Sequence, residues 1–391
     1  MSGQGDMSPR IRVPWSVWTA VASVTCILVG GYWDISWHMT IGRDTFWTPA
    51  HLAIQLGGII AGTCGGYLIF ATSLGRLSSE ATVRVWGFRG PLGAFVAVWG
   101  AAAMVISAPF DNWWHTAYGL DVKILSPPHM VLTIGILGVA SGAVLIVAAS
   151  LNRSVGTGGS SFASARGSGG AASRALELCL LFVAGEIMVL GMTAILEHTF
   201  RSNLHRADAY RAISIVAPLV LFTFARATGR RWAATIVATT YTVFMIAMLW
   251  LFPLFPAEPK LGPVYQPITH FIPEEFPMLI VFPAIACDLV LARIEHWPRY
   301  TRALVTGPIF VIVLLAAEWP FADFLMSEHA RNWVFGAHYH PYFMRPDWYS
   351  PKNLFIPETA LVKGLLEAAV AGTITSYLAM LVGDSLRRVK R

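Results

Sequence analysis

The chain has 391 residues, of which 55% are hydrophobic and only 13% are charged, whereas soluble domains carry about 25% charged residues. Together with a mean hydropathy of +0.57, this composition excludes an ordinary soluble domain and predicts an all-α, polytopic membrane bundle. The net charge of +6 requires no nucleic-acid partner, because basic loops suit an anionic membrane surface.

Ten segments are apolar over roughly the 20 residues that a helix needs to cross a bilayer. They are approximately 15–36, 50–72, 91–111, 129–151, 175–197, 209–226, 232–254, 276–293, 303–323 and 358–384. An even number of spans places both termini on one side, and arginines gather in the termini and loops of that side. The positive-inside rule makes that side cytoplasmic, which predicts a multi-pass protein of the plasma (inner) membrane with cytoplasmic termini.

A Gly/Ser-rich segment at 152–173 interrupts the series of spans after the fourth. Such a composition is typical of a flexible linker. We therefore expect a four-helix part at 1–151, a cytoplasmic linker, and a six-helix part with long outer loops at 174–391.

Histidines gather at the end of the predicted bundle that lies opposite the termini. Of the 11 histidines, all but His296 fall at or beyond the outer ends of predicted spans. Randomly placed histidines would divide more evenly between the two ends of the bundle. We therefore expect the functional site at the extracytoplasmic end.

An internal repeat places an acid and two histidines twice at this outer end. Asp34, His38 and His51 in the first copy correspond to Asp111, His115 and His129 in the second. In each copy the Asp and the first His are four residues apart, which puts them on one helix face. The second His opens the returning helix, so the hairpin brings it back to the same depth.

Two imidazoles and a carboxylate form a ligand set that suits copper, zinc or non-haem iron. A carboxylate near the hydrocarbon boundary is costly unless it is paired or bound to a metal. Asp44 and Asp121, in the hairpin loops, are candidates for orienting the histidine rings from outside the ligand set. The alternative is that each Asp and His form a simple hydrogen-bonded pair.

The spacing of these six residues resembles that of the C subunit of the particulate methane and ammonia monooxygenases. The resemblance covers roughly residues 15–151. It implies copper at Asp34, His38 and His51, with these residues as the catalytic centre, and a second copper at Asp111, His115 and His129. It also implies activation of O2 and hydroxylation of a small apolar or weakly polar substrate. Asp111 departs from the family, which has Asn there, and the rear six helices have no counterpart.

Further candidate ligands occur in the outer segments of the rear part. They are His198, His205, His338 and His340, which predict either an additional metal site or a solvated polar rim with ordinary ion pairs.

The function expected from the sequence is therefore that of a copper-dependent membrane monooxygenase. Its electrons would come from a quinol or a small redox protein, and further subunits or a homo-oligomer would fit the resemblance. Two alternatives remain open: a protein that binds haem or another transition metal for electron transfer or quinol oxidation, and a metal transporter.

Overall fold

The structure is a computed structural model that describes residues 13–42, 47–78, 81–119, 126–156, 170–345, 358 and 360–390. Nine helices within these ranges are long and apolar enough to cross a membrane. They are α1 (Trp15–Thr40), α2 (Pro49–Ser73), α3 (Leu92–Tyr118), α4 (Pro127–Gly156), α6 (Ala171–Ala194), α8 (Ala207–Thr228), α9 (Ala233–Leu251), α11 (Arg299–Met326) and α13 (Leu361–Leu386). The chain is thus an all-α polytopic bundle and a multi-pass membrane protein, as predicted.

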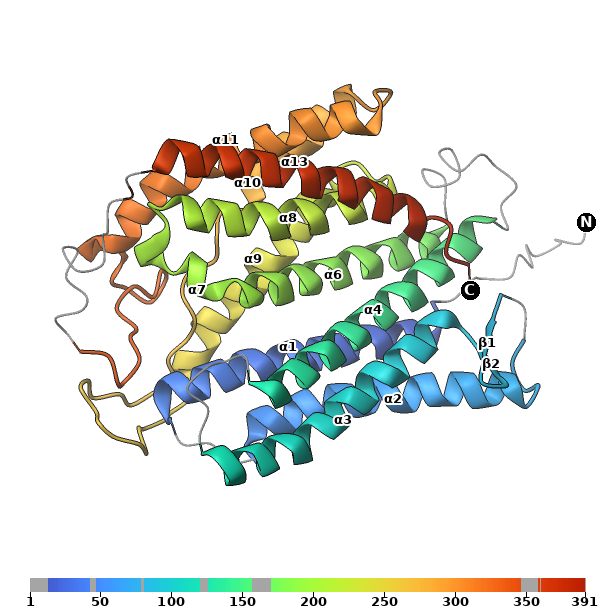
Figure 1. Cartoon of the computed structure of the whole chain (residues 1–391), viewed down its shortest axis with the longest axis horizontal. Coiled ribbons are helices and arrows are strands. Elements are labelled where there is room, and N and C mark those ends of the chain that lie inside the picture. Colours follow the sequence, from blue (N-terminus) through green and yellow to red (C-terminus); the bar gives the residue numbers. More distant parts are fainter. Residues whose placement is uncertain are drawn as a thin grey trace, which may run out of the picture.

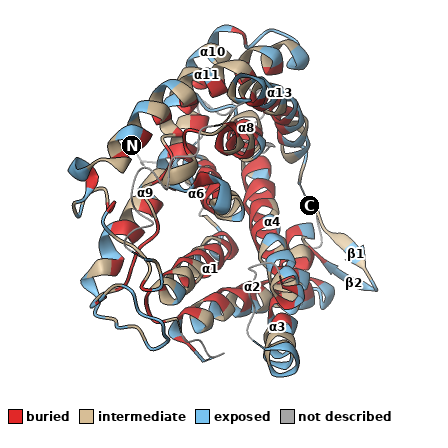
Figure 2. Ribbon diagram, turned by 60° about the vertical axis from the view of Figure 1, so that its left-hand side comes forward, coloured by how far each residue is buried: buried red, intermediate tan, exposed pale blue. Residues whose placement is uncertain are grey.

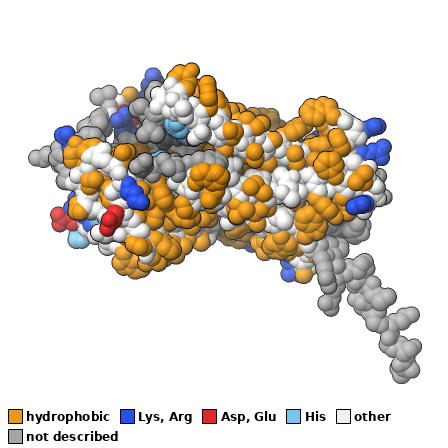
Figure 3. Space-filling model, turned by 90° about the horizontal axis from the view of Figure 1, so that it is seen from below, with side chains coloured by type: hydrophobic (Ala, Val, Ile, Leu, Met, Phe, Trp, Pro, Cys, Tyr) orange, Lys and Arg blue, Asp and Glu red, His pale blue; other side chains and the backbone are white. Residues whose placement is uncertain are grey.

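The long helices run side by side along one direction, and α1 begins at the end of the bundle where α13 finishes (Figure 1). Helices α6 and α8 occupy the middle, with α1 to α4 on one side and α9, α11 and α13 around the other (Figure 2). An orange band of apolar side chains separates two ends that carry charged side chains (Figure 3). We call them the arginine-rich end, where α13 finishes, and the histidine-rich end.

One predicted span differs from the structure. The segment predicted at 276–293 is helical only from Val281 to Arg293 (α10), which is too short to count among the nine. Pro273 and Pro277 precede it, and proline both lacks an N–H and disfavours helix in the residue before it. The chain therefore enters the bundle in an extended conformation before α10 begins.

The extended stretch is buried in protein, which is the condition for non-helical backbone inside a bundle. The N–H of Met278 donates to the hydroxyl of Tyr241 at 3.2 Å, and that of Leu279 to Oε2 of Glu318 at 2.8 Å. Glu318 is fully buried. This stretch and α10 lie in the chain between the start of α1 and the end of α13, which are at the same end of the bundle (Figure 1).

A small β-hairpin at the arginine-rich end was not predicted from the sequence. It consists of β1 (Val83–Val85) and β2 (Phe88–Gly90), paired antiparallel with Arg84 opposite Arg89. The valines of β1 pack against a small core between α2 and α3. The remaining short elements are α7 (Leu196–Thr199) and three 3₁₀ turns, η1 (Arg201–Asn203), η2 (Phe252–Leu254) and η3 (Glu328–Ala330).

The two predicted parts share one hydrophobic core. Helix α6 packs against both α1 and α4, and a continuous cluster of buried side chains runs from α1 through α4 and α6 to α13. The predicted linker lies mostly outside the described residues, since α4 extends to Gly156 and α6 begins at Ala171.

Candidate metal centres

The first centre consists of Asp34, His38 and His51, at the histidine-rich ends of α1 and α2. Oδ1 of Asp34 lies 3.1 Å from Nε2 of His51, and Oδ2 lies 3.8 Å from Nε2 of His38. The carboxylate therefore stands between one imidazole on its own helix and one from the returning helix. Helix α1 continues to Thr40, beyond the predicted end at residue 36, so that Asp34 and His38 are both helical.

The second centre repeats this arrangement with Asp111, His115 and His129 on α3 and α4. Oδ1 of Asp111 lies 3.5 Å from Nε2 of His115 and 3.6 Å from Nε2 of His129. Helix α3 also runs past its predicted end, to Tyr118, and it contains Pro109 two residues before Asp111.

Matched helix ends position the histidines in both copies. Four residues after the first histidine, Gly42 and Gly119 adopt φ angles of 77° and 85°, which only glycine reaches at little cost. The returning helices begin at Pro49 and Pro127, and proline suits the first turn of a helix. The second histidine of each centre therefore lies in the first turn of its helix.

Close helix packing brings the two helices of the first hairpin together. A Cβ added at Gly30 would lie 2.6 Å from the backbone nitrogen of Ile54 and 3.0 Å from the carbonyl oxygen of Ala50. The absence of a side chain lets α1 and α2 approach there, as small residues do between membrane helices. This contact lies one turn from Asp34 and directly beside the start of α2.

The ring of His115 is fixed by a backbone carbonyl. Its Nδ1 lies 3.1 Å from the carbonyl oxygen of Gly119, and because a carbonyl only accepts, Nδ1 must donate. In the neutral ring Nε2 is then an acceptor, and it faces Oδ1 of Asp111, which is a second acceptor. Such a pair requires a cation between the two atoms or a proton on Nε2.

Five carboxylate oxygens of the described residues are buried without a hydrogen bond, and two of them belong to the candidate centres. These two are Oδ1 of Asp34 and Oδ1 of Asp111, although each lies within 3.6 Å of an imidazole nitrogen. An unsatisfied buried acceptor costs about 1–3 kcal/mol. In both centres, the oxygen without a donor is the one that faces an imidazole from the returning helix.

The separations between these atoms fit ligands of one ion. Ligand atoms at about 2.0–2.2 Å from a tetrahedral ion lie roughly 3.3 Å apart, and the four carboxylate–imidazole distances range from 3.1 to 3.8 Å. However, no three His, Cys, Asp or Glu side chains of the described residues are arranged as they stand to hold a metal ion. In the first centre, the longest of these distances is that to His38, whose side chain is 50% exposed.

Segments of the rear part hold the end of α1. Ser36 donates from Oγ to the carbonyl oxygen of Ile272 at 2.6 Å, and Oγ1 of Thr40 accepts from the N–H of Ile272 at 2.8 Å. The N–H of Tyr342 donates to the carbonyl oxygen of Met39. The first centre is therefore fixed by outer segments that are more than two hundred residues away in the sequence.

Aromatic rings border both centres. Trp37 lies against Phe271, with ring centroids 5.9 Å apart. Near the second centre, Trp114 contacts Tyr118 at 4.5 Å and Phe110 at 6.3 Å. Such rings are also typical of membrane interfaces, so they indicate apolar surroundings without identifying a ligand.

The four candidate ligands of the rear part are not gathered into one set. His205 is buried with Nε2 3.0 Å from Oδ1 of Asp323. Nδ1 of His340 accepts from Nη2 of Arg201 at 2.9 Å, whereas His198 and His338 are exposed. These contacts lead to different partners, and the additional metal site stays a prediction.

Burial and neighbouring positive charge keep His340 neutral. Burial is the main reason why the pKa of His340 falls to about 3, and Arg201 and Arg331 lower it further. Arg201 also pairs with Glu275, at 3.4 Å from Nε to Oε1. The sequence does not indicate the pairing of Arg201 with Glu275, because 74 positions separate them and no local pattern links them.

The residues proposed to orient the histidine rings, Asp44 and Asp121, lie outside the described residues. Comparison of the chain with protein-family models, with curated proteins and with solved structures finds no match. The resemblance to the copper monooxygenase subunit therefore depends on the six repeated positions alone.

Proposed function

We propose that the protein is a copper-dependent membrane oxygenase with two Asp-His-His centres, one in each of its first two helical hairpins. The observation that carries the proposal is the acceptor pair of the second centre, in which Nε2 of His115 faces a carboxylate oxygen of Asp111 at 3.5 Å while Nδ1 is engaged by Gly119. Two acceptors that face one another favour a cation between them.

The chain's own residues would each have a defined task. Asp34, His38 and His51 would hold one ion, and Asp111, His115 and His129 the other, as facial sets with open positions. The bond from His115 to Gly119 orients the ring and fixes its tautomer, as partners of ligand histidines commonly do. Bound copper would supply the activation of O2.

The surroundings favour an apolar substrate. Trp37 and Phe271 lie beside the first centre, and Phe110, Trp114 and Tyr118 beside the second. Rings of this kind offer apolar contact area. They support hydroxylation of a small apolar or weakly polar molecule, with electrons from a quinol or a redox protein.

Haem has less support than a small ion. In both centres the two imidazoles face a carboxylate that lies between them. When two histidines ligate one haem, the macrocycle lies between them, in the position that the carboxylate occupies here.

The test measures the copper content of detergent-purified protein by mass spectrometry of the metal. We expect two ions in the wild type, and one fewer in both His51→Ala and His129→Ala. The exposed His329→Ala is the matched control and should retain both ions. The Cu(II) spectrum should show coupling to imidazole nitrogen, and quinol-dependent O2 uptake should disappear when copper is chelated. Equal copper content in all four proteins would refute the proposal.

A further inference from the structure

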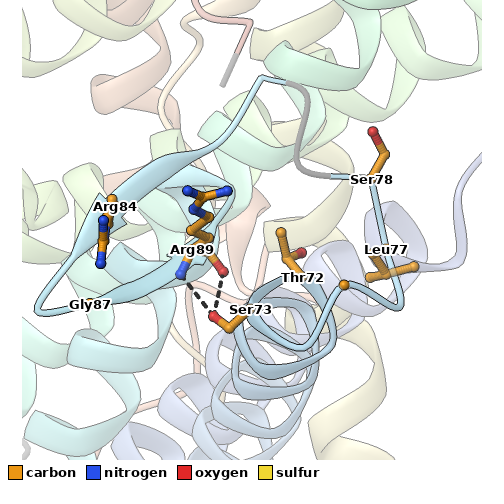
Figure 4. A pocket seen from close by; sticks show the side chains of 8 residues that line it. Thr72, Ser73, Leu77, Ser78, Arg84, Gly87 and Arg89 are labelled. Atoms are coloured by element: carbon orange, nitrogen blue, oxygen red, sulfur yellow. Dashed lines mark hydrogen bonds between the residues drawn. The ribbon is translucent and has the colours of Figure 1, made fainter.

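The β-hairpin at the arginine-rich end encloses a polar pocket with α2 and the turn that follows it. The pocket has a volume of about 520 Å³, within the range of ligand sites. Its lining consists of Thr72, Ser73, Gly75, Leu77, Ser78, Arg84, Gly87 and Arg89. In Figure 4, both arginines stand on the hairpin, with Ser73 bonded to the backbone of Arg89 and the turn of Leu77 and Ser78 across the opening.

The two arginines form a like-charged pair. Arg84 and Arg89 are direct partners in the antiparallel register, so their side chains share one face of the hairpin. Like charges in that position destabilise a strand pair. Val83 and Val85 face the core between α2 and α3 instead, which leaves the arginine face directed away from that core.

No carboxylate neutralises this pair within the part of the chain that the structure describes. Other arginines at this end do have acidic partners: Arg226 lies 2.6 Å and Arg299 2.8 Å from Asp384. The C-terminal end of α2 contributes about half a negative charge, which is less than the two positive charges of the pair. The hairpin therefore presents an excess positive charge beside hydroxyl groups.

The flanks of the pocket are apolar and exposed. Trp86, at the hairpin turn, is 86% exposed, and Leu74, at the end of α2, is 69% exposed. Phe70 and Phe88 contact one another edge to face at 5.5 Å. Trp86 lies 5.9 Å from Trp99 of α3. Aromatic residues favour the membrane–water boundary, so this pocket would open at the level of lipid headgroups.

We infer that the pocket formed by α2, its following turn and the β-hairpin binds the phosphate of an anionic phospholipid, held by Arg84 and Arg89. Arginine presents paired donors that match phosphate oxygens, and the exposed rings would contact the upper acyl chains. The inference is independent of the proposed copper chemistry, because the site lies at the opposite end of the bundle.

The test compares binding of phosphatidic acid and of phosphatidylcholine to the full chain in detergent, measured by native mass spectrometry. The variant Arg84→Gln/Arg89→Gln is matched by Arg231→Gln/Arg293→Gln, which removes the same charge from exposed positions at the same end. We expect the hairpin variant to bind phosphatidic acid about 30-fold more weakly, at about 5-fold per arginine, while the control changes little. The double lysine variant should be intermediate, because it keeps the charge without the paired donors.

Three results would overturn the inference. The control could lose as much affinity as the hairpin variant, which would indicate diffuse attraction to the whole surface. Inorganic phosphate could compete with phosphatidic acid at equal concentration, which would make a free anion the ligand. Finally, the hairpin variant could melt at a lower temperature in lipid-free detergent, which would assign the arginines a structural role; we expect an equal or higher melting temperature, since the opposed charges are removed.

Discussion

The contact between His115 and Asp111 is either an ion pair with a protonated imidazole or part of a metal centre. A hydrogen bond from His115 to the carboxylate would require a proton on Nε2, but Nδ1 already donates to Gly119. A neutral ring therefore leaves two acceptors 3.5 Å apart. Only a protonated imidazole or a bound ion removes the repulsion between these two acceptors. The two cases predict different changes in stability when Asp111 loses its negative charge.

Replacement of Asp111 by Asn tests this at the residue scale. The amide of Asn can donate to Nε2 of His115, so we expect Asp111→Asn to raise the free energy of unfolding of metal-free protein by about 1 kcal/mol. Melting temperatures of the wild type and of Asp111→Asn, measured after chelation of metal, test this prediction. Asp384→Asn, which weakens the ion pairs with Arg226 and Arg299, should lower the melting temperature. A loss of stability in Asp111→Asn would instead indicate an ion pair with protonated His115.

At the scale of the helical hairpin, the first centre depends on how closely α1 and α2 approach. Two neighbouring glycines make this testable, because their surroundings differ. Gly30 faces the backbone of α2, whereas a Cβ at Gly31 would have nothing within 4 Å. Both lie in the same turn of α1 and share its helical conformation.

We therefore expect Gly30→Ala to force α1 and α2 apart, with a loss of about 1–3 kcal/mol in the free energy of unfolding and of one copper ion. Gly31→Ala should keep both ions and gain up to about 1 kcal/mol, since alanine is the better helix former. Thermal unfolding and metal content of the two variants provide the comparison. Equal behaviour of the two would mean that this close approach does not position His51.

The helical hairpins that carry the candidate centres could be predicted because their sequence signals are local. The four-residue spacing of Asp34 and His38 indicates a shared helix face, and the returning helix brings His51 back to 3.1 Å from the carboxylate. The turn of the β-hairpin was missed because Trp86, with φ of 50°, occupies a position where Asn or Gly is the usual signal.

At the scale of the whole molecule, the segment before α10 shows what hydropathy could not predict. The stretch before α10 is apolar, but its backbone hydrogen bonds go to Tyr241 and Glu318, residues of other helices. Likewise, Ile272 is bonded to Ser36 and Thr40 of α1. Only tertiary packing specifies these pairs, so composition alone predicted a regular helix where the chain is extended.

The orientation of the bundle in the membrane follows from its two chemically distinct ends. The arginine-rich end carries both the hairpin arginines and the end of α13, and arginine favours the cytoplasmic side. Cysteines introduced at His329 and Lys390 can report the orientation, because both residues are exposed. His329 follows α11 and Lys390 follows α13, and these two helices finish at opposite ends of the bundle (Figure 1). The native cysteines are buried or half-buried, which limits background labelling.

We expect a membrane-impermeant maleimide to label His329→Cys in intact cells and Lys390→Cys only after the membrane is opened. The wild type gives the background. This result would place the two candidate centres on the extracytoplasmic side, where copper could reach them without crossing the bilayer. It would also place the pocket of Arg84 and Arg89 in the cytoplasmic leaflet, whose anionic lipids suit its charge. The reverse labelling would contradict the assigned orientation, and labelling of both cysteines from outside would contradict a membrane crossing by α13.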